Sequence, residues 1–106
     1  MDKYSKVIEN IKAVANKVLP KGSSLYLYGS RARADAHEDS DWDLLLLLDK
    51  PHIENDDFAK YSYPIMESGW EIGEDSSVHT YSKDQWNNGP HALFYFNVEA
   101  DKKVLI

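Results

Sequence analysis

The sequence predicts a single α/β domain over residues 1–106. Segments whose apolar residues have helical spacing alternate with short apolar runs that have the length of strands. Their order is helix, strand, helix, strand, helix, strand, helix, which is typical of a mixed α/β architecture. Hydrophobic residues make up 42% of the chain, enough for one modest core, and neither a repeat nor a linker divides it.

The first elements are an amphipathic helix and a strand. Residues 2–20 carry apolar side chains at helical spacing with a polar opposite face, and Pro20 and Gly22 end the predicted helix. Residues 23–29 then alternate aromatic side chains with leucines over about the length of a strand.

A leucine run follows a short polar connection. Residues 30–36 contain helix formers, with Ser30 as a predicted N-cap, and residues 37–40 form a polar loop. The run 41–48 holds five successive leucines between this loop and a second group of turn residues. Its short length favours a strand that is buried on both faces.

The second half of the chain predicts further helices around one strand. Residues 52–73 suit a helix or a pair of helices that Pro64 kinks or divides. Residues 75–82 are the third strand candidate, and a short helix begins at 83. Pro90 suits the first position of the last helix. The remaining segments are that helix through residue 100, a turn at 101–103 and a short edge strand at 104–106.

The charge and residue content exclude several classes of function. Twelve basic and eighteen acidic residues give a net charge of −6, so bulk binding of nucleic acid is not expected, although a local cation can still hold a small anion. The absence of cysteine excludes disulfides and thiolate metal sites. No segment has the apolar length of a signal peptide or a membrane span, so we expect no membrane association and a cytoplasmic location.

Asp41 and Asp43 are the first candidates for chemistry. Alternate side chains of a strand share a face, so these carboxylates lie together with Cα atoms about 6.5–7 Å apart. Two like charges held this close favour a cation, and Mg²⁺ prefers carboxylate and phosphate oxygens. A pair of aspartates also occurs at the solvated entrance to a buried strand, so the pair by itself does not decide between these interpretations.

Gly29 and Ser30 form a candidate phosphate site ten residues earlier. Glycine has no Cβ, so an anion can approach the main chain, and the serine hydroxyl adds a donor at the start of the next helix. An ordinary strand-to-helix turn has the same residues. If the two strands are neighbours, however, this turn and the carboxylate pair face one pocket.

The string GSRARADAHEDSDWD, residues 29–43, resembles the G-S-x10-D-x-D signature of the nucleotidyltransferase superfamily with the DNA polymerase β-type fold. It is most similar to the small stand-alone prokaryotic members called minimal nucleotidyltransferases. The likeness covers roughly residues 1–100 and includes VHTYSKDQW at 78–86. It implies a small mixed sheet flanked by helices.

The resemblance also implies roles for the motif residues. Gly29 and Ser30 would hold the phosphates of a nucleoside triphosphate, with ATP the expected one. Asp41 and Asp43 would bind one or two Mg²⁺ ions. Arg33 matches an arginine of the family motif and would hold phosphate or pair with a carboxylate; a purely structural role is the alternative.

A third acidic residue is expected from a later strand, where the family uses it to bind metal and to accept a proton. Asp75, at the start of the strand 75–82, is the predicted residue, and Glu74 and Glu71 are rivals. The other chemically interesting residue of this strand is His79. The four histidines have no zinc-ligand spacing.

The chain departs from the family pattern at two positions. Ala34 stands where the family has glycine, and Trp42 stands where a smaller aliphatic residue is common, so Trp42 either crowds the neighbouring layer or lines the pocket. Arg31 is expected to be a solvated helix residue.

The function that this resemblance implies is Mg²⁺-dependent transfer of a nucleoside monophosphate, AMP from ATP, to a hydroxyl acceptor. Stand-alone relatives are often encoded beside a small helical toxin of the HEPN class, which is the expected partner and acceptor. The alternative is a non-catalytic nucleotide- or metal-binding module of antitoxin type that masks such a partner. The aromatic run at 93–96 cannot all face inward on one helix, so a homodimer or a protein complex is also expected.

Overall fold

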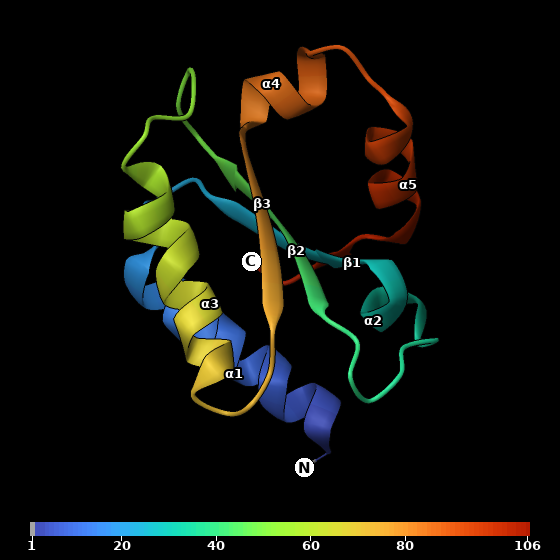
Figure 1. Ribbon diagram of the computed structural model, residues 1–106. Helices are drawn as coiled ribbons and strands as arrows, with labels where there is room; N and C mark the ends of the chain where they lie inside the picture. Colours follow the sequence, from blue (N-terminus) through green and yellow to red (C-terminus); the bar gives the residue numbers. More distant parts are fainter. Residues whose placement is uncertain (1) are drawn as a thin grey trace.

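The computed structural model describes residues 2–106 and has a central sheet with helices on both sides (Figure 1). The elements in chain order are α1 (Lys3–Val18), β1 (Ser24–Tyr28), α2 (Gly29–Arg33), β2 (Trp42–Leu48), the π-helical turn η1 (Phe58–Ser62), α3 (Tyr63–Trp70), β3 (Ser76–Ser82), α4 (Lys83–Asn88), α5 (Leu93–Asp101) and β4 (Lys103–Val104). The predicted α/β class with a small mixed sheet is confirmed. Within residues 2–106, no helix combines the length and apolar character that a membrane span requires.

The sheet has the strand order β3-β2-β1-β4. Strand β1 runs antiparallel to both β2 and β4, whereas β2 and β3 are parallel, with η1 and α3 in the connection between them. The end of β1 therefore lies beside the start of β2, and β3 starts at this same edge. We call this end of the three strands the site edge, because every motif residue of the sequence lies on it or next to it.

Helices α1 and α3 cover one face of the sheet, as Figure 1 shows. The predicted first helix is confirmed: α1 begins after Asp2, whose carboxylate accepts the backbone N–H of Ser5 at 2.8 Å. Its apolar stripe packs on alternate side chains of β2 and on α3. The fully or almost fully buried members of this layer include Val7, Ile11, Ala15, Trp42, Leu44, Leu46, Leu48 and Ile65.

The other face of the sheet is covered by α4 and α5, and β2 is therefore buried on both sides. Leu45 and Leu47 point to this second face and pack with Trp86 of α4 and Val98 of α5. Complete burial of one leucine side chain contributes roughly 2 kcal/mol to folding, so a run of leucines is stabilising only where both faces are covered. The predicted two-sided burial of this strand is confirmed.

Two helix boundaries in the second half of the chain test the sequence predictions: one confirms a prediction and the other corrects one. The helical stretch after β2 is divided next to Pro64 into η1 and α3, as predicted. The prediction that Pro90 opens the last helix is wrong, because α5 begins at Leu93 with Ala92 as its N-cap. The intervening His91 instead stacks its ring on Tyr95, with centroids 3.6 Å apart, and this contact holds the chain in an extended approach to α5.

Candidate functional site

Gly29 and Asp43 are in direct contact at the site edge. The register of β1 and β2 pairs Tyr28 with Asp43, so the residue after β1 lies against the Asp43 side chain. A Cβ atom on Gly29 would lie 2.5 Å from Asp43 Oδ2, closer than real side chains allow. Gly29 also has φ +74, a conformation that residues with a Cβ rarely adopt. Both facts favour glycine here, and the paired register confirms that β1 and β2 are neighbours.

Asp41 and Asp43 project from the same face at the start of β2, the face that carries α4 and α5. Asp41 is exposed and Asp43 is half-buried. Burial raises the pKa of Asp43 above its ordinary value, the Asp41 carboxylate raises it further, and His79 and Arg33 oppose the increase. The pair thus carries unfavourable negative charge, which a bound cation would relieve.

Asp75 and Glu74 lie just before β3 but have different surroundings. The backbone carbonyl of Asp75 accepts the N–H of Trp42 at 2.9 Å, which places Asp75 beside Asp41 at the site edge. Glu74 Oε1 accepts the indole N–H of Trp42 at 2.9 Å and forms an ion pair with Lys3 at 3.4 Å. Since Trp42 faces the α1 side of the sheet, Glu74 is directed away from the Asp43 face.

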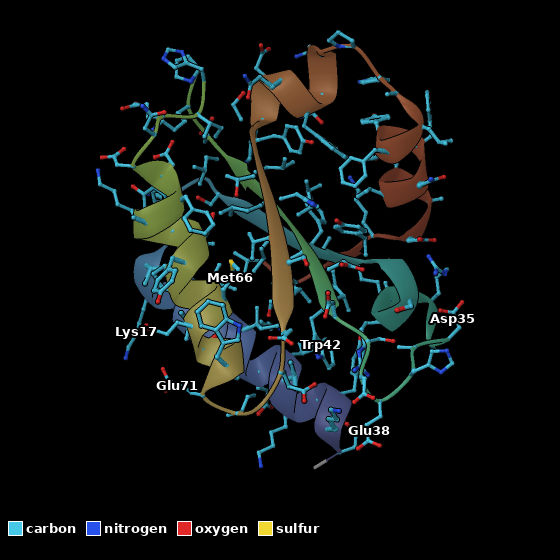
Figure 2. All side chains as sticks on the ribbon, in the orientation of Figure 1. Lys17, Asp35, Glu38, Trp42, Met66 and Glu71 are labelled. Carbon is cyan, nitrogen blue, oxygen red and sulfur yellow. The ribbon has the colours of Figure 1, made fainter. Side chains whose placement is uncertain are left out.

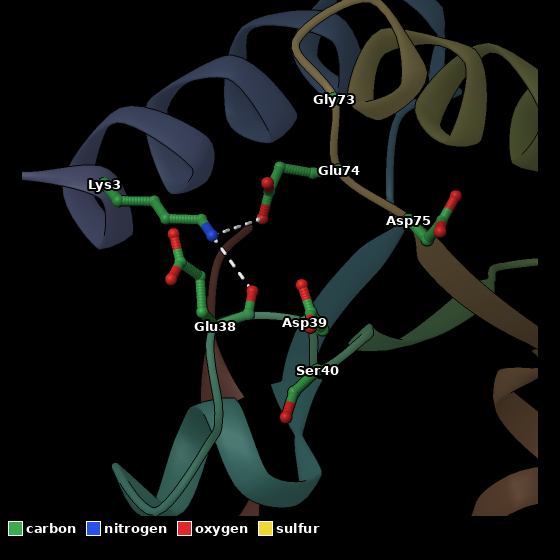
Figure 3. Close-up of a pocket in the computed structure, with 7 residues that line it drawn as sticks. All are labelled: Lys3, Glu38, Asp39, Ser40, Gly73, Glu74 and Asp75. Carbon is green, nitrogen blue, oxygen red and sulfur yellow. Dashed lines mark hydrogen bonds and ion pairs between the residues drawn. The ribbon is translucent and has the colours of Figure 1, made fainter.

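A polar hollow of about 320 Å³ opens next to these residues. It is lined by Lys3, Glu38, Asp39, Ser40, Gly73, Glu74 and Asp75, and in Figure 3 the Asp75 carboxylate points away from the Lys3–Glu74 pair. The remaining rival for the third carboxylate, Glu71, lies at the exposed end of α3 (Figure 2).

Ser30 and Arg33 belong to the five-residue helix α2. The prediction that Ser30 is the N-cap is wrong: the helix begins one residue earlier at Gly29, and Ser30 uses its carbonyl to accept the N–H groups of Ala34 and Asp35. Ala34 has φ 64 in the left-handed C-cap position, which explains why the family places glycine there.

Arg33 ties α2 to α5 rather than projecting freely into solvent. Its Nη1 donates to Asp101 Oδ2 at 2.6 Å, and its Nε donates to Asp35 Oδ2 at 3.1 Å. These hydrogen bonds raise the pKa of Arg33, that to Asp101 most strongly. A role of Arg33 toward phosphate stays a prediction.

The family model described as "Polymerase beta, Nucleotidyltransferase" matches residues 9–105. The chain belongs to the DNA polymerase β-type nucleotidyltransferase family. No curated protein sequence matches this nucleotidyltransferase. The resemblance inferred from the G-S-x10-D-x-D string is thereby confirmed at the level of the family.

Solved structures share the fold of this nucleotidyltransferase. A chain in a toxin–antitoxin complex crystallised with AMP-PNP is 17% identical, with a TM-score of 0.67 over 93% of this chain and 72% of that one. A Sulfolobus solfataricus protein proposed to be a nucleotidyltransferase is 19% identical, with a TM-score of 0.59 over 95% and 80%. A chain of the toxin–antitoxin pair MntA–HpeT, in a mutant with two aspartates changed to glutamate, is 14% identical, with a TM-score of 0.58 over 99% and 73%.

Nucleotidyltransferases of this family generally use a divalent metal ion. The residues of this chain fit such an ion, because Asp41 and Asp43 offer hard oxygen ligands on one face and the Asp41 carboxylate contributes to the raised pKa of Asp43. Among residues 2–106, no group of three or more His, Cys, Asp or Glu side chains is close enough to hold a metal. The third ligand predicted at Asp75 stays a prediction.

Arg31 was expected to be solvated, and this expectation is wrong. Its guanidinium lies over the Trp42 ring, 4.4 Å from the centroid, and its side chain is only 11% exposed. Nη2 donates to the carbonyls of Glu38 and Ser40 at 3.0 and 2.9 Å. Arg31 therefore holds in place the loop that precedes Asp41 at the site edge. The large aromatic residue Trp42, unusual for the family, was the signal that a planar cation could stack on it.

We expect Arg31→Ala to lower the free energy of unfolding by about 2 kcal/mol, because it removes a buried cation–π contact and two hydrogen bonds from a charged donor. Arg33→Ala is the matched control, since it removes the same charge from the same helix but from a side chain that is 48% exposed, and a smaller loss is expected although its ion pairs with Asp35 and Asp101 are removed. Urea unfolding of both variants measures the difference. Equal losses of unfolding free energy in the two variants would contradict the proposal that Arg31 stabilises this loop.

His79 is the site residue that sequence reasoning left without a role. The registers of the sheet place it on the same face as Asp43 and Tyr28. Tyr28 Oη and His79 Nδ1 are hydrogen-bonded at 3.2 Å, and Phe94 of α5 packs edge-on against both rings. Tyr28 and His79 are 51 residues apart in the chain and lie on β1 and β3, which β2 separates, so the local spacing of residues could not reveal this pair.

Proposed function

We propose that this chain is a Mg²⁺-dependent nucleotidyltransferase that transfers AMP from ATP to a hydroxyl group of a partner protein. One observation supports the proposal most: the contact between Gly29 and Asp43, which joins the two halves of the G-S-x10-D-x-D motif at the site edge. The carboxylates that would hold the metal and the turn that would hold phosphate then serve one substrate.

The motif residues have separate tasks in the proposed reaction. Gly29 lets a phosphate approach the main chain, and the hydroxyl of Ser30 donates to it. Asp41 and Asp43 hold Mg²⁺, which when bound offsets the charge that develops on the phosphates. The acceptor oxygen forms a bond to the α-phosphorus, the bond to the pyrophosphate oxygen breaks, and the acceptor proton passes to a carboxylate, for which Asp75 is the proposed residue.

A protein acceptor is favoured by the exposed apolar residues of α5. Leu93 and Phe96 of α5 are 75% and 58% exposed, which is a surface suited to a protein partner or a second copy of this chain. Two structures with the same fold were crystallised as toxin–antitoxin complexes. We therefore propose a toxin of the HEPN class as the partner, with the chain acting as its antitoxin.

The proposed function predicts transfer of label from ATP to a protein. The chain is incubated with Mg²⁺, with ATP labelled at the α-phosphate and with the protein encoded beside it, and denaturing gels detect the labelled species. We expect label on the partner, release of pyrophosphate, and loss of both when EDTA removes the metal. Unlabelled partner and no pyrophosphate under these conditions would reject nucleotidyl transfer.

The second candidate is a module that binds nucleotide and metal and masks its partner without turnover. The observation in its favour is that no third carboxylate joins Asp41 and Asp43 among the described residues. Binding of Mg²⁺–AMP-PNP together with an absence of pyrophosphate release from ATP would distinguish this module from the enzyme.

A further inference from the structure

We propose that His79 binds a phosphate oxygen of the nucleotide through Nε2, with Tyr28 as the residue that orients its ring. This inference rests on the proposed function. It adds to the motif a residue from β3, the strand on which the resemblance implies a carboxylate instead. Three observations support it: the position of His79, the hydrogen bond of its Nδ1, and the hydrogen bonds that Arg33, the other basic residue acting on Asp43, already makes.

His79 lies on the face of the sheet that carries α4 and α5, the same face as the Asp43 carboxylate. Asp43 pairs with Ser77, and His79 is two residues further along β3, so it projects to the same side as Asp43. His79 is exposed, while Tyr28 is largely buried. An exposed side chain of this kind usually has free rotation, yet this ring is held by a hydrogen bond from one side and by Phe94 from the other.

The hydrogen bond to Tyr28 occupies Nδ1 and leaves Nε2 as the ring nitrogen that can bind a ligand. Tyr28 Oη and His79 Nδ1 share this hydrogen bond, and the tautomer of the ring decides which atom donates. An anionic oxygen beside Nε2 selects the tautomer in which the Tyr28 hydroxyl donates to Nδ1 and the ring hydrogen lies on Nε2. Nε2 is then a donor that suits an anionic oxygen, and it is unsuited to accept the proton of the acceptor hydroxyl.

The local charges explain why such a donor is needed. ATP approaches a chain with a net charge of −6 at a place where Asp41 and Asp43 already repel it. Two basic side chains, His79 and Arg33, act electrostatically on Asp43, but Arg33 already donates to Asp35 and Asp101. Within residues 2–106, His79 uses only Nδ1 in a hydrogen bond, so Nε2 is the donor available to phosphate.

Binding of Mg²⁺–AMP-PNP, measured by isothermal titration calorimetry, tests the proposal. We expect His79→Leu to weaken this binding about tenfold, as loss of one hydrogen bond to a charged group does, and His79→Gln to restore part of it with its amide N–H. Tyr28→Phe should weaken binding two- to threefold, on the order expected when a donor is present but not oriented. Binding of adenosine, which has no phosphate, should not change in any of these variants.

His52→Leu is the matched control, because His52 lies in the loop after β2, beyond the strand end opposite Asp43, and is exposed. This variant should bind AMP-PNP as the wild type does. Wild-type affinity of His79→Leu for AMP-PNP overturns the inference alone, as does an equal loss of adenosine binding, which would indicate a packing role. If the unaltered chain does not bind AMP-PNP at all, the proposed function and this inference both fail.

Discussion

Asp43→Asn is expected to slow AMP transfer by about 10²–10³-fold while leaving the fold at least as stable as the wild type. Asp43 is one of two proposed metal ligands, and removal of one electrostatic group of this kind lowers turnover by about 10²–10³-fold. The same carboxylate is unfavourable to folding, because burial and Asp41 raise its pKa above the ordinary value of 3.8. A neutral amide of similar shape removes that penalty.

The raised pKa of Asp43 sets the direction in which the stability of the wild-type protein changes with pH. A carboxyl group whose folded pKa is raised binds its proton more tightly in the folded state, so its contribution to stability falls as pH rises from 3.8 through the folded pKa. Wild-type protein should therefore lose stability over this interval relative to Asp43→Asn. Urea unfolding at pH 4 and pH 8, with initial rates of label transfer at pH 8, measures both effects.

Asp39→Asn is the control for Asp43→Asn. Asp39 is exposed in the loop before β2, so the substitution makes the same change of charge two residues before Asp41. Its transfer rate should remain within about twofold of the wild type, since Asp39 is exposed and is not one of the proposed metal ligands. A large loss of stability in Asp43→Asn, or equal loss of transfer in both variants, would argue against the assignment of Asp43.

Gly29→Ala is expected to damage both the fold and the site. The left-handed backbone at φ +74 costs a residue with a Cβ about 1–2 kcal/mol. The new Cβ also meets Asp43 Oδ2 at 2.5 Å, and relief of such an overlap costs a further 1–3 kcal/mol, roughly, and displaces the carboxylate. We therefore expect a loss of about 2–5 kcal/mol in unfolding free energy, together with loss of Mg²⁺-dependent AMP-PNP binding.

Gly73→Ala separates the two contributions. Gly73 has φ +76, almost the same as Gly29, but a Cβ on it has no atom within 4 Å. It should lose only the backbone share, about 1–2 kcal/mol, and bind nucleotide normally. Adding Asp43→Ala to Gly29→Ala should recover part of the additional loss, because the clashing oxygen is gone. Equal destabilisation by the two alanine substitutions would show that the Gly29–Asp43 contact is not tight.

The sequence by itself determined the elements and the family. The 3.6-residue spacing in 2–20 has one stable outcome, a helix with one buried stripe, and five leucines between turn residues need a cover on both sides. The string from Gly29 to Asp43 was sufficient to predict the nucleotidyltransferase family, because its chemistry resides in residues that are close along the chain.

Only the tertiary structure decided which side chains meet across strands. The pairing of Tyr28 with Asp43 and the bond from Tyr28 to His79 depend on strand order and register, which long-range hydrogen bonds set and local spacing does not encode. Arg31 was mispredicted for the same reason: short-range pattern places an arginine on a polar helix face, but the fold brings Trp42 beneath it. A side chain's partner is a property of the packed sheet, whereas its position on a strand or helix is a property of the chain.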